Sequence, residues 1–159
     1  MRSVIPNNTM KKSTYIPEGS TLLQERFINT MMQQGKKSIS RKIVRETFIE
    51  IGRQNSGQDP ERVFEKAVEN VKPQMEVKPK RIGGAVYQIP VEVKSNRQIS
   101  LAFRWIIQAA RGINGKPMAN KLAAVLMEAA LGTGPAVKKK EDAHRMAQAN
   151  KAFAHFAKY

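Results

Sequence analysis

The sequence predicts a mainly α-helical single domain, with about six helices and one protruding two-stranded β-ribbon. Three observations support this prediction. Apolar residues recur at helical spacing through most of the chain. One stretch, at about residues 75–93, is instead rich in β-forming residues on both sides of a Gly-Gly pair. The length of 159 residues and the hydrophobic content of 41% suit one hydrophobic core.

The N-terminal part of the chain divides into an arm and a first helix. Residues 1–18 hold two prolines and no apolar periodicity, so we expect a flexible arm, followed by the helical domain at residues 19–159. Thr21 and Gln24 fit a capping box, which predicts the start of the first helix. Gly35 is expected to end it.

The next two helices are separated by a polar loop, predicted at residues 52–57. The second helix is expected to begin at Ser38, with Ile39, Ile43, Phe48 and Ile51 on its apolar side. Asp59 followed by Pro60 is a strong signal for the start of the third, because Asp suits the cap position and Pro the first turn.

The β-ribbon is predicted to turn at Gly83 and Gly84. This turn pairs Lys80 with Tyr87 and Lys78 with Ile89, so neither face of the ribbon is cleanly apolar. Such a hairpin cannot pack flat on a core and is marginal alone in water. We therefore expect it to project from the body, with its tip ordered by an external partner such as phosphate.

The rest of the chain predicts three more helices, separated at residues 112–117 and 132–135. The last of them is expected to include Phe153. Trp105 lies on an apolar stripe, which favours a place in the core, although a tryptophan could also stack on a nucleic-acid base.

The net charge of +15 indicates a polyanionic partner, either nucleic acid or an anionic membrane. The positive charge is spread over most of the chain, but residues 46–75 carry six acidic and four basic side chains. This segment could face away from the polyanion, or it could be an ordinary solvated helix with Glu–Lys pairs.

The sequence contains no catalytic constellation, so we expect no enzyme, no cofactor and no metal site. The chain has no cysteine, which excludes disulfides and thiolate metal sites. His144 and His155 are eleven residues apart, whereas two histidines on one helix face need a spacing of three or four. No apolar run is long enough to cross a membrane, and we expect no membrane partner.

Basic groups therefore carry the functional signal. Lys36 and Lys37 follow the expected end of the first helix, where they could complement the helix dipole or bind phosphate. Arg97, Arg104 and Arg111 recur every seven residues and would form a track of cations along one helix. A DNA-compacting or regulatory protein and a peripheral membrane protein are the alternatives to an RNA-binding protein.

Several separate motifs resemble the small-subunit ribosomal protein seven family of the bacterial and organellar type. The ribbon reads EVKPKRIGGAVYQIPVEV at residues 76–93. Further matches are MMQQGKKS at 31–38, LAFRW at 101–105, the Ala-Ala-Arg at 109–111, and VKKKEDAHRMAQANKAFAHF at 137–156. They occur in the family's order over roughly residues 20–157.

The resemblance implies a structural ribosomal protein that binds the 3′ major domain of small-subunit rRNA, the head, and nucleates its assembly. It also implies a position beside the exit-site tRNA and the mRNA exit, with small-subunit proteins nine and eleven as neighbours. The expected location is the ribosome, in a bacterial cytoplasm or an organelle.

The candidate site residues combine the matched motifs with other basic positions along the chain. The ribbon tip, expected near tRNA and mRNA, comprises Arg81, Ile82, Gly83 and Gly84. The candidates for rRNA binding are Lys11, Lys12, Lys36, Lys37, Arg41, Lys78, Lys80, Arg81, Arg97, Arg104, Arg111, Lys116, Met118, Lys138, Lys139, Lys140 and Arg145.

Overall fold

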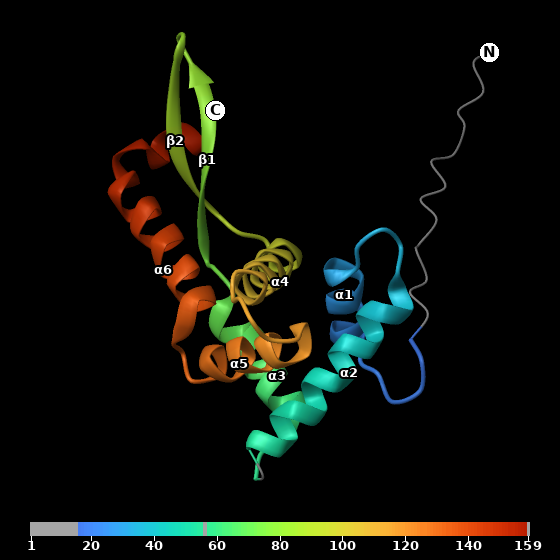
Figure 1. Cartoon of the computed structure of the whole chain (residues 1–159). Helices are drawn as coiled ribbons and strands as arrows, with labels where there is room; N and C mark the ends of the chain where they lie inside the picture. The colour runs from blue at the N-terminus through green and yellow to red at the C-terminus, as the bar shows by residue number, and fades with distance from the viewer. Residues whose placement is uncertain (1–15, 56, 159) are drawn as a thin grey trace, which may run out of the picture.

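The computed structural model describes residues 16–55 and 57–158. Most of the expected N-terminal arm, with Lys11 and Lys12, lies outside the described residues. A helical body carries one antiparallel β-ribbon, which rises from it beside α6 (Figure 1). The mainly α-helical prediction is confirmed. The elements are α1 (Leu22–Met31), α2 (Lys37–Gln54), α3 (Pro60–Val71), β1 (Met75–Ile82), β2 (Ala85–Glu92), α4 (Ser95–Arg111), α5 (Met118–Ala130), α6 (Gly134–Ala149) and the 3-10 helix η1 (Lys151–Lys158).

The capping box at the start of α1 is present. The Thr21 hydroxyl accepts the Gln24 backbone N–H, and the Gln24 side chain accepts the Thr21 N–H, both at 3.2 Å. The helix ends at Met31, however, and not at Gly35. The backbone becomes extended at Met32, and left-handed φ angles at Gln34 and Gly35 then turn the chain into α2.

Helix α2 differs from the prediction in two ways. Its buried face is made by Ser40, Val44, Thr47 and Ile51, whereas Ile39 is 54% exposed. At 100° per residue, Ile39 is rotated away from this face. The helix also continues to Gln54, so the first three residues of the predicted polar loop are helical.

The core forms around α5, which contacts α2, α3, α4 and α6. Leu122 and Leu126 of α5 are fully buried. Beside them, Phe27 meets Phe64 and Phe103 edge-on, with ring centroids 5.3 and 5.1 Å apart. Such edge-to-face pairs stabilise a core beyond the area that they bury.

Helix α4 presents one side to this core. Trp105 is partly buried and packs against the core cluster. This position agrees with the structural interpretation of the tryptophan. The predicted start of α3 is also observed, because the Asp59 carboxylate accepts the Glu61 backbone N–H and Pro60 occupies the first turn.

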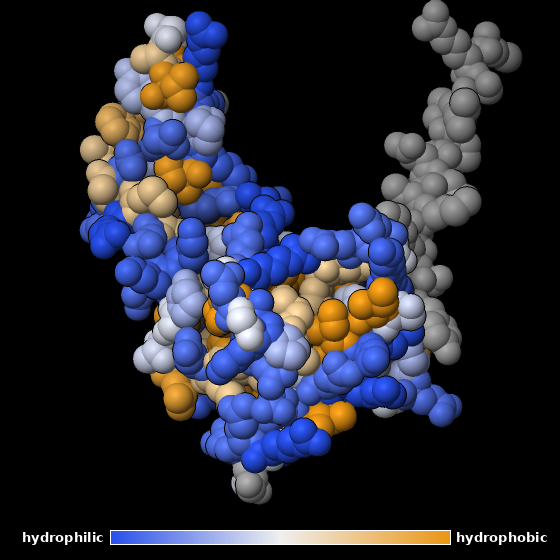
Figure 2. Space-filling model, viewed as in Figure 1, coloured by the Kyte–Doolittle hydropathy of each residue, from blue (hydrophilic) through white to orange (hydrophobic). Residues whose placement is uncertain are grey.

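The ribbon has the predicted register, with Lys80 opposite Tyr87 and Lys78 opposite Ile89. Both turn glycines have positive φ angles, as the tight primed turns require. The turn residues are exposed, and the ribbon projects from the body (Figure 2). The turn at Gly83 and Gly84 is therefore not packed in the core.

The chain itself supports the strands of the ribbon, whereas the ordering of the tip by an external partner stays a prediction. Helix α6 ends at Ala149, so Phe153 belongs to the separate helix η1 and not to a continuous last helix. Helix η1 lies against β2, where Phe153 and Phe156 pack on Tyr87 with ring centroids 5.4 and 5.5 Å away. An aromatic cluster thus covers one face of the outer ribbon.

Candidate nucleic-acid interface

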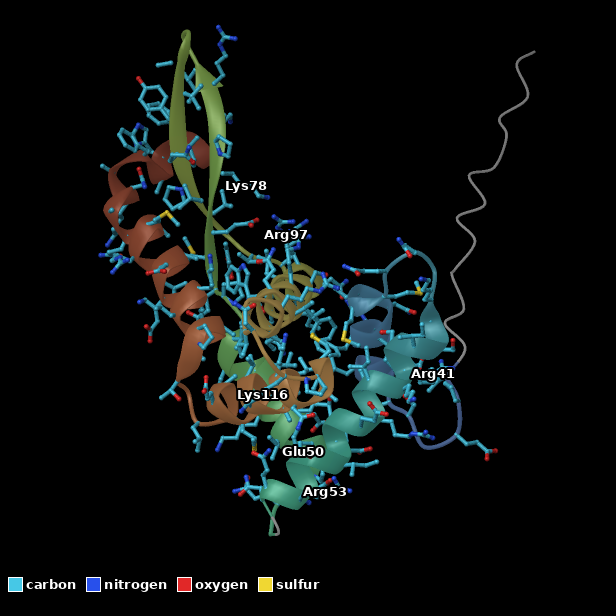
Figure 3. All side chains as sticks on the ribbon, in the orientation of Figure 1. Arg41, Glu50, Arg53, Lys78, Arg97 and Lys116 are labelled. Carbon is cyan, nitrogen blue, oxygen red and sulfur yellow. The ribbon has the colours of Figure 1, made fainter. Side chains whose placement is uncertain are left out.

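One cluster of predicted binding residues lies at the base of the ribbon. Arg97, in the first turn of α4, and Lys78 of β1 are labelled in Figure 3, and both meet the carboxylate of Glu76. The Arg97 Nε donates to the two carboxylate oxygens at 2.8 and 3.0 Å, and the Lys78 Nζ lies 3.3 Å from one of them. Sequence reasoning named both cations but missed the carboxylate that joins them.

A second cluster joins the starts of α1 and α2. The Glu25 side chain is fully buried, and the Arg41 Nη2 donates to it at 2.9 Å. The Lys37 Nζ lies 3.5 Å from the same oxygen, and the Ser20 hydroxyl donates to the other at 3.2 Å. A carboxylate shared by two cations is thus again present beneath predicted binding residues.

Both carboxyl groups are held ionised by their partners. Burial alone would raise the pKa of Glu25, but the hydrogen bond and charge of Arg41, helped by Ser20 and Lys37, lower it below its ordinary value. The hydrogen bond from Arg97 is the main cause of the lowered pKa of Glu76, with Lys78 adding to it against the effect of burial. The same bond raises the pKa of the Arg97 guanidinium.

The third feature is a hollow of about 290 Å³ between the α1–α2 turn and the start of α5. Five of its ten lining residues are apolar, and two, Lys36 and Arg111, are cations. The Arg111 Nη2 donates to the Met31 carbonyl at 3.1 Å, which ties the end of α4 to the end of α1. The lining residues are Met31, Met32, Gln33, Gln34, Lys36, Ile39, Ser40, Ile43, Arg111 and Met118.

This hollow brings together three candidates from distant parts of the sequence, namely Lys36, Arg111 and Met118. It also explains the exposure of Ile39, which contributes to the hollow instead of the core. Sequence reasoning assigned Ile39 to the core because helical spacing alone does not distinguish a buried stripe from an exposed apolar one.

The cations of α6 lie apart from this hollow. Helix α6 contacts the ribbon, α3, α4 and α5, and the described parts of α1 and α2 do not touch it. In Figure 1 it stands on the opposite side of α4 from α1 and α2. Lys138, Lys139 and Arg145 on α6 are exposed. The predicted cations therefore occupy more than one face of the molecule.

Several candidates are engaged within the fold. The Lys140 Nζ donates to the Asn70 carbonyl at 2.6 Å, near the end of α3, where a cation satisfies an unpaired carbonyl. The Lys80 Nζ donates to the Phe156 carbonyl at 3.3 Å. Arg145 pairs with Asp142 on its own helix at 2.7 Å. Lys140 and Lys80 thus have structural partners that sequence spacing did not reveal.

Other candidates are exposed and have no ion pair with any residue that the structure describes. Arg104, at the middle of the predicted α4 track, is one of them, whereas its neighbours in the track are bonded to Glu76 and to the Met31 carbonyl. Fourteen residues of helix separate the ends of the track by about 21 Å. The exposed and unpaired candidates are Lys36, Arg81, Arg104, Lys116, Lys138 and Lys139.

The described residues offer no group of three or more His, Asp or Glu side chains that could hold a metal ion. None of the described helices is both long enough and apolar enough to cross a bilayer. Of the two histidines, His144 has a structural contact: its Nε2 accepts the Gln74 backbone N–H at 2.9 Å, just before the ribbon begins.

A helical body with a projecting basic ribbon, a cation-rimmed apolar hollow and a net charge of +15 defines a polyanion-binding protein. The sequence comparisons specify this class. Residues 1–151 match the model of the family described as ribosomal protein S7p/S5e, and the chain belongs to this family.

Bacterial relatives agree with the family assignment. The small ribosomal subunit protein uS7 of Salinibacter ruber is 55% identical over 131 residues, which cover 82% of this chain and 83% of the relative. The protein of the same name from Solidesulfovibrio magneticus is 48% identical over 155 residues, or 98% of this chain and 93% of the relative. That of Carboxydothermus hydrogenoformans is 55% identical over 138 residues, 87% of each chain.

Family membership confirms the resemblance found in the motifs. The protein is a structural, RNA-binding component of the small ribosomal subunit that takes part in translation. It is located at the ribosome and is not an enzyme.

Proposed function

We propose that the protein binds the 3′ major domain of small-subunit rRNA and nucleates the assembly of the subunit head. The observation that carries this proposal is the hollow between α1, α2 and α5, where Lys36, Arg111 and Met118 meet. An apolar floor with a cationic rim fits an unpaired nucleotide, whose phosphate binds the cations while its sugar and base cover the methionines.

The cations around the hollow extend this surface over folded RNA. Lys37 and Arg41 lie on the first two turns of α2, next to Lys36. Arg104 is exposed on α4, and Lys78 and Arg97 continue the surface to the ribbon. Contacts from several elements suit an RNA with several helices, because A-form RNA is recognised mainly by its shape and backbone. The arm at residues 1–18, with Lys11 and Lys12, is proposed to add further phosphate contacts.

The ribbon tip is proposed to lie beside the exit-site tRNA and the mRNA exit. Arg81, Gly83 and Gly84 are exposed, and Ile82 is partly exposed. A narrow, projecting finger with one free cation can approach a nucleic-acid backbone without moving the helical body. Small-subunit proteins nine and eleven are proposed as neighbours in the assembled head.

The binding proposal is tested by filter binding of the full chain to a transcript of the head domain, with duplex DNA of equal length as competitor. If the interface neutralises ~6–10 phosphates, affinity should fall by about 10³–10⁵ between 50 and 200 mM salt. Chemical footprinting of the same transcript should show protection within the 3′ major domain. A complex that is insensitive to salt, or that duplex DNA displaces as readily as head RNA does, would overturn the proposal.

A further inference from the structure

Two carboxylates lie beneath the cations of the candidate interface, and each forms ion pairs with two cations. Glu76 of β1 joins Lys78 of its own strand to Arg97 of α4. Glu25 of α1 joins Lys37 and Arg41 of α2. On a protein that binds a polyanion, an acidic side chain at the interface weakens long-range attraction. Their presence at these points therefore needs another reason.

The geometry of Arg97 supplies that reason. On Arg97, only the Nε is bonded to Glu76, at 2.8 and 3.0 Å, so the two terminal nitrogens of Arg97 have no partner among the described residues. The Arg97 side chain is 50% exposed, whereas that of Glu76 is 12% exposed. The carboxylate thus fixes one edge of the guanidinium from below and leaves the other edge free. A free planar edge is what bidentate phosphate binding requires.

Arg41 is held through a terminal nitrogen instead. Its Nη2 bonds to the buried Glu25, and its Nε is buried without a hydrogen-bond partner in the described structure. The Arg41 side chain is nonetheless 41% exposed. The guanidinium is therefore held by one terminal nitrogen, Nη2, while the other, Nη1, has no partner among the described residues. Lys37, 37% exposed, is held by the same carboxylate.

We propose that Glu76 and Glu25 are positioning residues, which fix these arginines and lysines in the orientation that binds the phosphates of folded rRNA. The inference rests on the proposed rRNA-binding function. Binding orders long flexible side chains at a cost in conformational entropy, and side chains that are already fixed lose less on binding. The carboxylates thereby weaken the general attraction to polyanions and strengthen the binding of an RNA whose phosphates match the fixed side chains.

The test uses Glu76→Gln in the full chain, with Glu92→Gln as the matched control. Glu92 lies on β2 at the same end of the ribbon, is exposed, and has no ion pair with a described residue. Both substitutions remove one negative charge. Affinity is measured for the head-domain transcript and for a nonspecific RNA duplex of equal charge, and amide exchange of β1 and β2 is recorded for each variant.

Positioning predicts that Glu76→Gln changes the affinity for the two RNAs differently. Glu76→Gln should bind the head-domain transcript about 3- to 10-fold more weakly, through the loss of two fixed side chains. It should bind the duplex as well as the wild type or slightly better, because a negative charge is gone. Glu92→Gln should bind both RNAs slightly better. In an Arg97→Gln background, Glu76→Gln should weaken binding of the transcript much less than it does alone.

Three results would overturn the inference. One is tighter binding of the transcript by Glu76→Gln, as for the control. Another is weaker binding that comes with faster amide exchange across the ribbon, because Glu76 would then support the fold alone. The third is failure of the proposed function itself. It is recognised in the wild-type chain, which would then bind the transcript no more tightly than the duplex. Glu25→Gln, with Glu65→Gln as its exposed control, repeats the affinity comparison at the second cluster. Because the buried Glu25 also stabilises the junction of α1 and α2, the amide-exchange criterion applies to Glu76 alone.

Discussion

The ring of Tyr87 on β2 lies 5.5 Å, centroid to centroid, from the ring of Phe156 on η1, so the C-terminal helix covers the outer ribbon. The Lys80 Nζ reinforces this contact from β1 by donating to the Phe156 carbonyl at 3.3 Å. An isolated two-stranded hairpin is marginal in water. Helix η1 therefore packs on the two strands and holds this ribbon in a fixed position before any RNA is bound.

The first prediction follows from this contact. Phe156→Ala should loosen the ribbon while leaving the helical body folded, because the Phe156 ring packs on β2 and lies outside the core cluster. An aromatic pair contributes about 0.5–1.5 kcal/mol beyond its buried area. Amide exchange of β2 should rise severalfold, with little change in the thermal unfolding of the body. Met146→Ala, at an exposed position of α6, is the control; equal exchange in the two variants would show that η1 does not support the ribbon.

The second prediction concerns the turn of the ribbon. Gly84 has a φ of +89°, and no atom lies within 4 Å of the place that a Cβ would occupy. Gly84→Ala should therefore strain only the backbone, at a cost of about 1 kcal/mol. Amide exchange near the tip is expected to increase. Gly57→Ala is the control, because Gly57 has the same open surroundings without a positive φ, and its amide exchange should match that of the wild type. If the amides near the tip of Gly84→Ala exchange as slowly as in the wild type, the assigned turn is contradicted.

The third prediction separates RNA binding from folding. Lys36 is exposed at the N-cap of α2, where the helix dipole favours negative charge. Lys36→Glu should therefore leave the stability within about 0.5 kcal/mol of the wild type. It should weaken binding of head RNA and lower the slope of log K against log salt by about one unit.

The control for Lys36→Glu is Lys66→Glu. Lys66 is exposed on α3, within the acidic segment at residues 46–75 that is expected to face away from RNA. The charge change is the same in the two variants. If both weaken RNA binding equally, the effect is one of net charge, and the hollow is not the binding site.

Local sequence signals were sufficient to predict most elements of the fold. The cap at Asp59 and the Gly-Gly turn work within a few residues, so their consequences were visible without tertiary information. The end of α2 was not visible in this way. Gly52 reads as a loop residue, but the helix continues through it, and the position of its missing Cβ lies 3.7 Å from Pro60 Cγ, where α3 packs closely. Tertiary packing thus overrides the helix propensity of this glycine.

The candidate site was predictable only in part, because charge is visible in the sequence and pairing is not. Glu25 and Arg41 are 16 residues apart, and Glu76 and Arg97 are 21 apart. No helix or strand repeat links residues at such separations. Composition therefore identified the cations, whereas only the fold shows which of them carboxylates hold.

The fourth prediction concerns pH. The pKa of Glu25 is lower in the folded protein than its ordinary value of 4.5. A group whose pKa falls on folding stabilises the fold above its unfolded pKa, and this stabilisation is lost as the pH drops through the folded pKa. Glu25→Gln should lower the free energy of unfolding by about 1–3 kcal/mol at pH 7, since Arg41 and Lys37 lose a charged acceptor. At pH 3 the wild type has begun to lose the same interaction, so the difference between the two proteins should narrow. Urea denaturation at the two pH values measures this difference.

The control is Glu92→Gln, whose free energy of unfolding at pH 7 should lie within about 0.5 kcal/mol of the wild type. If Glu25→Gln is less stable than the wild type by the same amount at both pH values, the ionised carboxylate is not what stabilises the junction of α1 and α2.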